Sequence, residues 1–398
     1  MATIRPFRAL RPTPVDAAAI AAVPYDVVNT VEARSLAGDN PLSFLRVSRS
    51  ELELPNGTDP YSTTVYDRAV ENFDRLRQRM VVEDEPSLYF YKQRMGAHEQ
   101  TGLAGCWLLD EYDRDVIKKH EKTRRDKEDD RTRHMIALKA QTGPVFLTYR
   151  SSPDVDEVAR RVTATSPLID FKAADGVQHT IWKVDRTGCA ALESAVGRIP
   201  ALYIADGHHR AASAARARTQ LNGAGESSTF LAVAFADNQV QILPYNRIVR
   251  TLGTLTPAEF ERAVRERFDV ADGPASPSQR GDVAMYFAGK WQTLRGRVTP
   301  AGDAIRSLDV SVLQEQLLGP VLGIADVTTD KRIDFVGGAR GTRELEHLVD
   351  SGNAVVAFSM FPVSVSDLMA VSDAGAIMPP KSTWFEPKLR DGLLIHLL

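Results

Sequence analysis

The residues best suited to chemistry form the run Asp206-Gly207-His208-His209-Arg210, between an apolar and an alanine-rich segment. We expect a strand over Ala201–Ala205 and a helix over Gly207–Leu221, which places the run at a helix N-terminus. Such an end presents unpaired N–H groups and the positive end of the helix dipole, and both favour an anion. Gly207 lacks a Cβ, so a ligand can approach the backbone closely. The run therefore predicts a phosphate-binding site.

Side chains of the same run add to this prediction. His208, His209 and Arg210 supply further donors, and an arginine can hold two phosphate oxygens at once. Asp206 suits an N-cap or a ligand of Mg²⁺ beside the phosphates. The plainer alternative is an N-cap with polar neighbours. Zinc is not expected, because adjacent histidines rarely converge on one ion and the usual ligand spacings are missing.

Two other segments carry chemistry of the same kind. The charged stretch His120–Arg131 reads either as a mobile loop that brings His120, Glu121, Lys122 and Arg131 to phosphates or as a solvated surface segment. Lys381, Ser382 and Thr383 follow two prolines and suit an anion-binding loop or an ordinary exposed loop. The glycines of a P-loop are missing there.

A carboxylate near the N-terminus is a candidate for proton transfer. Asp26 follows Pro24 and Tyr25, where the proline stiffens a turn. A carboxylate held in this way could act as a general base, or it could simply cap the turn.

Helical and strand patterns alternate along the chain, which predicts a mixed α/β (α+β) fold. A helix is expected over Thr63–Met80, and a turn at Asn40-Pro41 followed by a strand over Leu42–Val47. We expect two regions: residues 1–250, which bind the nucleotide and carry an N-terminal elaboration, and residues 251–398, an α/β region that contributes the Lys381–Thr383 loop to the site.

Composition excludes several other classes of protein. The 398 residues are 43% hydrophobic and 25% charged, with a net charge of -3. Such a chain has no global basic field to hold a nucleic acid. It also has no apolar stretch of roughly 20 residues for a membrane span, and no N-terminal leader pattern. We expect a cytoplasmic protein that could form oligomers, with no nucleic acid or membrane partner.

Six motifs taken together resemble the bacterial and archaeal DUF1015 family, a domain of unknown function. They follow the family's order and span most of the chain: Arg5–Pro12, Pro24–Val28, His120–Thr123, Asp206–Arg210, Leu243–Arg247 and Met378–Thr383. The run at Asp206 also resembles the phosphate-binding turn of the ParB/sulfiredoxin-like fold. The resemblance implies a nucleotide-binding core of that type, elaborated with an additional sheet and helices.

Free-serine kinases of that superfamily carry a similar turn, so the resemblance implies an ATP-dependent kinase of a free amino acid. The reaction would convert L-serine to O-phospho-L-serine with ATP and Mg²⁺. Asp206 carries over to the site by motif, and Asp26 and Glu121 are candidates for the base. The alternatives are a non-catalytic nucleotide sensor and a nucleotide hydrolase. The chain lacks ParB's basic helix-turn-helix region and sulfiredoxin's cysteine in the turn, which disfavours both of those activities.

Overall fold

The computed structural model describes residues 1–297 and 303–398. The chain divides into two compact units. The first contains Met1–Val240 together with Pro387–Leu398, and the second contains Gln241–Glu386. The C-terminal segment therefore returns to the first unit, which a linear boundary near residue 250 does not anticipate.

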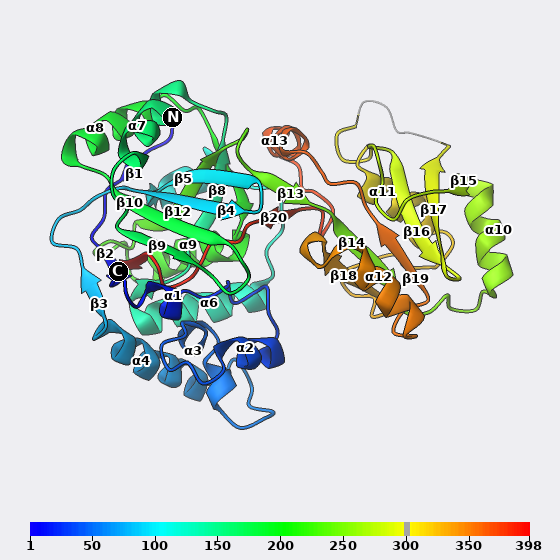
Figure 1. Ribbon diagram of the computed structural model, residues 1–398, viewed down its shortest axis with the longest axis horizontal. Helices are drawn as coiled ribbons and strands as arrows, with labels where there is room; N and C mark the ends of the chain where they lie inside the picture. Colours follow the sequence, from blue (N-terminus) through cyan, green and yellow to red (C-terminus); the bar gives the residue numbers. More distant parts are fainter. Residues whose placement is uncertain (298–302) are drawn as a thin grey trace. The chain divides into compact units, whose positions relative to one another are not determined.

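The first unit is built on a mixed nine-stranded sheet (Figure 1). In sheet order its strands are β6 (Ile117–Lys118), β11 (Leu202–Asp206), β8 (Val145–Tyr149), β12 (Thr229–Ala236), β5 (His98–Leu108), β4 (Tyr89–Met95), β10 (Gln178–Lys183) and β9 (Ile169–Lys172), with β1 (Ile4–Arg5) beside β5. β11 is parallel to β6 and antiparallel to β8, and β8 is parallel to β12. All other pairs in this sheet are antiparallel.

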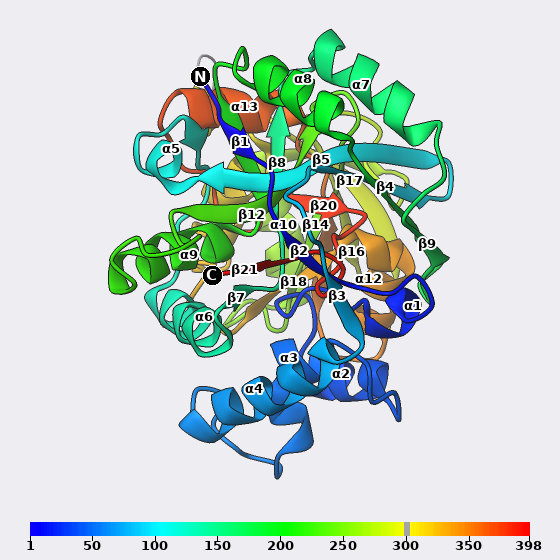
Figure 2. The same ribbon diagram turned by 90° about the vertical axis from the view of Figure 1, so that its left-hand side faces the viewer.

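Helices cover both faces of this sheet. Figure 2 shows α7 (Pro153–Thr163) and α8 (Arg186–Val196) on one face, and α6 (Arg125–Leu138) and α9 (His208–Gln220) on the other. The remaining helices of the unit are α1 (Ala17–Ile20), α2 (Thr30–Ala37), α3 (Leu45–Ser48), the 3₁₀ turn η1 (Ser50–Glu53), α4 (Thr63–Arg77) and α5 (Leu109–Asp113). A small sheet joins β3 (Met80–Val82), β2 (Ala9–Pro12), β21 (Ile395–Leu397) and β7 (Ala140–Gln141).

Small residues hold α9 close to the sheet. Ala211, Ala214 and Ala217 are buried in the same core as Trp107 and Phe230. An alanine face lets the helix backbone approach the strands, and alanine also has the best helix propensity. This packing fixes the N-terminus of α9 at the end of β11.

The second unit contains a six-stranded antiparallel sheet with its own core around Ile248, Leu345 and Ala357. Its strands, in sheet order, are β15 (Phe268–Asp272), β17 (Lys290–Gly296), β16 (Asp282–Phe287), β19 (Val356–Ser359), β14 (Tyr245–Val249) and β18 (Ile333–Gly337), and a separate pair joins β13 (Gln241–Leu243) to β20 (Trp384–Glu386). Its helices are α10 (Pro257–Arg267), α11 (Asp309–Leu313), the π-helix η2 (Gln314–Leu318), the 3₁₀ turn η3 (Gly338–Arg340), α12 (Gly341–Asp350) and α13 (Val365–Asp373).

The mixed α/β class predicted from the sequence is confirmed. The helix expected over Thr63–Met80 is α4, and the strand and helix around the Asp206 run are β11 and α9. The strand expected over Leu42–Val47 is wrong, because Leu45–Ser48 form the helix α3. Among the helices of residues 1–297 and 303–398, none combines the length and apolar character that crossing a membrane requires.

Candidate phosphate-binding site

The N-terminus of α9, at the turn after β11, has no side-chain cap among the described residues. Gly207 is the N-cap residue, with φ 92° and ψ 31°, in the left-handed region that favours glycine. No side chain of the described residues caps α9, and the N–H of Ala211 makes the first bond of its ladder, to Gly207 O at 3.1 Å. The N–H groups of residues 208–210 therefore precede the ladder. They form the donor set that an anion requires.

Asp206 does not cap the helix, so the N-cap alternative for this residue is wrong. Its Oδ1 accepts a hydrogen bond from the N–H of the next residue, Gly207, at 2.9 Å. Its Oδ2 lies 3.2 Å from Lys388 Nζ and 3.7 Å from Arg210 Nη2. Burial opposes ionisation of Asp206, but the charges of Lys388 and Arg210 outweigh it and hold the pKa of this carboxyl well below its usual value.

Arg210 turns into the protein rather than away from it. Its side chain is buried, Nη1 donates to the carbonyl of Pro144, and Nη2 lies 3.9 Å from Asp26 Oδ2. The guanidinium folds beneath Gly207, where an added Cβ would lie 3.1 Å from Arg210 Cζ. The guanidinium thus brings the Asp206 and Asp26 carboxylates together around one buried cation.

A histidine cluster borders the turn on another side. His208 Nδ1 lies 3.7 Å from Glu121 Oε2, and the His120 and His208 rings meet edge to face with centroids 4.5 Å apart. Burial lowers the pKa of His120 to about 4, and burial and His120 lower that of His208. Both imidazoles are therefore neutral near pH 7. His209 Nε2 accepts from the N–H of Arg124 at 3.0 Å, and Lys122 is exposed.

Two sets of residues bear on metal binding. Asp206 fits Mg²⁺ poorly, because Oδ1 is hydrogen-bonded and Oδ2 is paired with cations. The His120, Glu121 and His208 ligand atoms lie within 4.8 Å of one another. This group combines His208 with His120, which is distant in sequence, and not with the adjacent His209.

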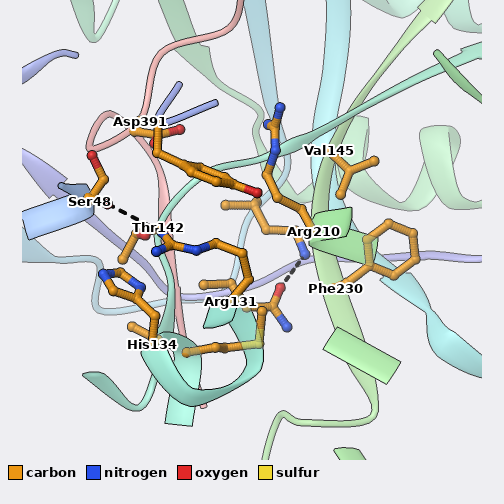
Figure 3. A pocket seen from close by; sticks show the side chains of 14 residues that line it. Ser48, Arg131, His134, Thr142, Val145, Arg210, Phe230 and Asp391 are labelled. Carbon is orange, nitrogen blue, oxygen red and sulfur yellow. Dashed lines mark hydrogen bonds between the residues drawn. The ribbon is translucent and has the colours of Figure 1, made fainter. Parts of the chain in front are cut away.

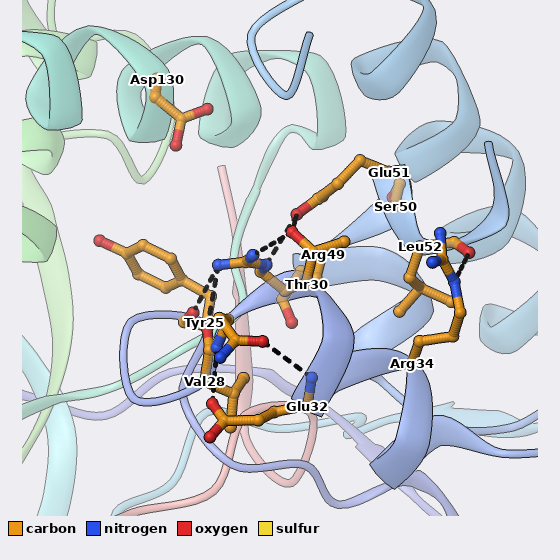
Figure 4. Close-up of polar contacts among 12 residues, drawn as sticks. Tyr25, Val28, Thr30, Glu32, Arg34, Arg49, Ser50, Glu51, Leu52 and Asp130 are labelled. Atoms are coloured by element: carbon orange, nitrogen blue, oxygen red, sulfur yellow. Dashed lines mark hydrogen bonds and ion pairs between the residues drawn. The ribbon is translucent and has the colours of Figure 1, made fainter. Parts of the chain in front are cut away.

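Arg49 stabilises the loop that carries Asp26 by hydrogen bonds to the loop backbone (Figure 4). Its Nη1 donates to the carbonyls of Tyr25 and Val28, each at 3.1 Å, and Nη2 donates to Thr30 Oγ1 at 2.8 Å. Its Nε forms an ion pair with Glu51 Oε1 at 2.8 Å. A single guanidinium thus fixes the backbone on both sides of Asp26.

A small pocket lined by both polar and apolar side chains lies on the buried side of the Arg210 side chain (Figure 3). Its charged lining groups are Arg131, Arg210 and Asp391, and Phe230, Leu231 and Val145 supply apolar wall. Arg131 pairs with Asp130 at 2.7 Å and donates to the carbonyl of Ser48 at 3.3 Å. The pocket therefore shares Arg210 with the phosphate-binding turn.

The predicted residues of the C-terminal loop lie in the second unit. Lys381 is exposed, and its carbonyl accepts from Arg247 Nη2 at 3.1 Å. Ser382 Oγ donates to the carbonyl of Pro379 at 2.6 Å. That Lys381, Ser382 and Thr383 join the site of the first unit stays a prediction.

Sequence reasoning missed Lys388, Asp391 and Arg49 as contributors to this region. Lys388 and Asp391 lie in the C-terminal segment and have no motif that points to the Asp206 turn. Arg49 lies where a strand was expected to have just ended. The one available signal was the concentration of charged residues between Glu386 and Asp391 in an otherwise apolar C-terminus.

The sequence model of one family, described as "Protein of unknown function (DUF1015)", matches residues 4–311. The chain belongs to the DUF1015 family. This confirms the family resemblance seen in the motifs. No curated protein is significantly similar to this DUF1015 protein.

Several solved structures resemble the DUF1015 chain at low identity. A free serine kinase variant in complex with ADP is 14% identical, with a TM-score of 0.38, and the match covers 74% of this chain and 92% of that one. SbnI with a C-terminal truncation, from Staphylococcus aureus, is 12% identical over 74% and 87%, with a TM-score of 0.38. A conserved hypothetical protein from Pyrococcus furiosus is 15% identical over 74% and 95%, with the same TM-score. Likeness at this level carries no inference about activity.

Proposed function

We propose that this DUF1015 protein is an ATP-dependent kinase of a free amino acid, with L-serine converted to O-phospho-L-serine. The observation that carries the proposal is the N-terminus of α9, which has no side-chain cap among the described residues. Beside it Asp206, Lys388, Arg210 and Asp26 form ion pairs whose N···O distances are all below 4 Å. Hydrogen-bond donors for phosphate groups thus lie at the same place as carboxylates that can accept a proton from a hydroxyl. The serine-kinase resemblance of the turn supports the choice of reaction.

Phosphoryl transfer depends mainly on positioning and on neutralising charge. The N–H groups of residues 208–210 would donate to the phosphates of ATP, and Lys388 would add to their neutralisation. The acceptor hydroxyl oxygen forms a bond to the γ-phosphorus while the bond from that phosphorus to the β–γ bridging oxygen breaks. ADP leaves, and the hydroxyl proton passes to a carboxylate. Magnesium would enter with the nucleotide as part of the substrate.

Two carboxylates are candidates for the base. Asp26 lies 3.9 Å from the guanidinium that also contacts Asp206, and its side chain is 34% exposed. Glu121 lies 3.7 Å from His208 on the other side of the turn, and its side chain is 41% exposed. We favour Asp26, because Arg210 ties it directly to Asp206 and a partly exposed carboxylate can meet a substrate. Asp206 is already paired with two cations and would orient groups rather than accept a proton.

The test is direct. The purified full chain is incubated with ATP, Mg²⁺ and L-serine, and phosphoserine and ADP are measured together. We expect both products in equal amounts. A panel of other small hydroxyl compounds follows, because the acceptor could differ from serine. The proposal fails if no phosphorylated product forms with any of them.

The same measurements separate the alternatives. Phosphate and ADP release without an acceptor would indicate a nucleotide hydrolase. Saturable nucleotide binding in calorimetry without any turnover would indicate a sensor. Either result would overturn the kinase while leaving the phosphate-binding role of the turn in place.

A further inference from the structure

The pocket behind Arg210 contains three buried polar atoms without hydrogen-bond partners. They are Ser48 Oγ, Arg210 Nε and Asp391 Oδ1, and none of them meets a partner among the described residues. Their residues are 3%, 8% and 3% exposed. An unpaired buried polar atom loses its hydrogen bonds to water without replacing them, so three around one space call for a ligand or ordered water.

The three atoms differ in character. Arg210 Nε is a cationic donor, Asp391 Oδ1 is a carboxyl acceptor, and Ser48 Oγ can donate or accept. The other polar groups of the two arginines are engaged, since Arg131 pairs with Asp130 and Arg210 Nη1 donates to Pro144. What the pocket leaves open is one N–H donor of a guanidinium and one carboxyl oxygen, with a hydroxyl among the same lining residues. This pattern complements a zwitterion.

The shape of the pocket limits the size of such a ligand. Its free space compares with that of a few water molecules, too little for a nucleotide. Val145, Phe230 and Leu231 form an apolar wall that suits a short side chain. Gly143 lines the pocket beside Asp391, and a Cβ there would lie only 2.4 Å from Asp391 Oδ1. Any side chain at this position would clash with the carboxyl of Asp391, so glycine makes room for Oδ1.

We propose that this pocket binds a small α-amino acid as its zwitterion. The carboxylate would lie against Arg210 Nε and Ser48 Oγ, and the ammonium against Asp391 Oδ1. Arg210 also contacts Asp26 and Asp206, so an amino acid here would lie against the guanidinium that borders the phosphate-binding turn. The role of the bound amino acid as phosphoryl acceptor rests on the proposed kinase function; its binding does not.

Calorimetric titration of the full chain, with and without ADP, tests the proposal. The probes are L-serine, L-alanine, propionate, which lacks the ammonium, and ethylamine, which lacks the carboxylate. We expect both amino acids to bind, and each truncated compound to bind at least about tenfold more weakly, because each leaves a buried charged group unpaired. L-alanine has no hydroxyl to phosphorylate, so its binding is independent of kinase activity.

Two variants locate the binding. Asp391→Asn should weaken L-alanine binding by about tenfold or more and abolish the preference over propionate, and Ser48→Ala should weaken both compounds. Asp309→Asn and Ser372→Ala are matched controls, since they alter a buried carboxyl and a buried unpartnered hydroxyl in the second unit. Both controls should bind as the parent does.

Three outcomes would contradict the proposal, and each has a different consequence. If neither amino acid binds with or without ADP, the pocket holds only water and the inference fails, whereas phosphoserine formation would still support the kinase. If propionate binds as tightly as L-alanine, Asp391 does not hold an ammonium and the zwitterion is wrong. Unchanged binding in both Asp391→Asn and Ser48→Ala places the amino acid elsewhere and also overturns the proposal.

Discussion

Lys388 Nζ lies 3.2 Å from Asp206 Oδ2, although 182 residues separate them in the sequence. The contact is formed because the C-terminal segment returns to the first unit after the chain has completed the second. It places a cation beside the turn that begins α9 and keeps the Asp206 carboxyl ionised. A segment distant in sequence therefore completes the electrostatics of the candidate phosphate site.

Replacing Lys388 tests this contact. Lys388→Met keeps much of the side-chain length but removes the charge, so we expect the KM for ATP to rise by roughly tenfold and the free energy of unfolding to fall by about 1–3 kcal/mol. Lys183→Met is the control, because Lys183 also pairs with a buried carboxylate, Glu83, but has no contact with the turn. An unchanged KM in Lys388→Met would show that this cation does not act on the nucleotide.

The choice of base predicts a contrast between two conservative variants. Asp26→Asn should lower kcat by about 10²–10⁴ with little change in KM, because the amide cannot accept the hydroxyl proton. Glu121→Gln should lower kcat by less than about tenfold, since the amide keeps its place beside His208. Steady-state kinetics with ATP and the acceptor measure both. The reverse ranking would transfer the role of base to Glu121.

The local part of the site could be predicted from the sequence, because local rules determine it. The apolar run before Asp206 and the alanines after Arg210 specify strand, turn and helix, and Gly207 supplies the left-handed residue between them. The family itself was also recognisable from motifs. Short apolar runs are ambiguous, however. The pattern of Leu42–Val47 predicts a strand, yet Leu45–Ser48 form α3, because a short apolar run can be buried equally well by a helix.

The pairing of Arg210 with carboxylates from distant parts of the chain could not be predicted from the sequence. An arginine in a helix's first turn is normally exposed, so Arg210 was expected to reach out to phosphate. In the fold Asp26, Asp206 and Asp391 surround it, and they raise its pKa despite burial. These three carboxylates come from segments far apart in the chain. Their convergence depends on tertiary packing, which has no signature in composition or periodicity.

The Arg49 contacts predict an effect on activity without contact with substrate. Arg49→Met removes the donors to the Tyr25 and Val28 carbonyls, so the loop should loosen and kcat should fall by roughly tenfold. Arg34→Met is the matched control, because Arg34 holds Leu52 and Asn56 in the same region but not the loop. Arg49→Lys should restore part of kcat. Equal kcat in the Arg49 and Arg34 methionine variants would mean that Arg49 only supports folding.

The stability of the first unit should depend on pH through Asp391. Burial raises the pKa of Asp391 to about 7 from an ordinary value of 3.8, with Arg210 opposing the shift and Asp26 adding to it. Between these pH values the folded state binds more protons than the unfolded state, so this group's contribution to stability falls as the pH rises. His120 and His134, with pKa values lowered to about 4 by burial, contribute in the opposite direction up to about pH 6.5.

Comparison with Asp391→Asn separates the two effects, because the histidine contribution is common to both proteins. The parent should lose up to roughly 4 kcal/mol relative to the variant between pH 4 and pH 7, at about 1.4 kcal/mol per pH unit. Hydrogen exchange of the β8 and β12 amides reports on the first unit alone. Bound L-alanine should reduce this difference, since an ammonium beside Asp391 favours the ionised carboxyl. Parallel stability profiles for parent and variant would show that Asp391 titrates normally in the fold.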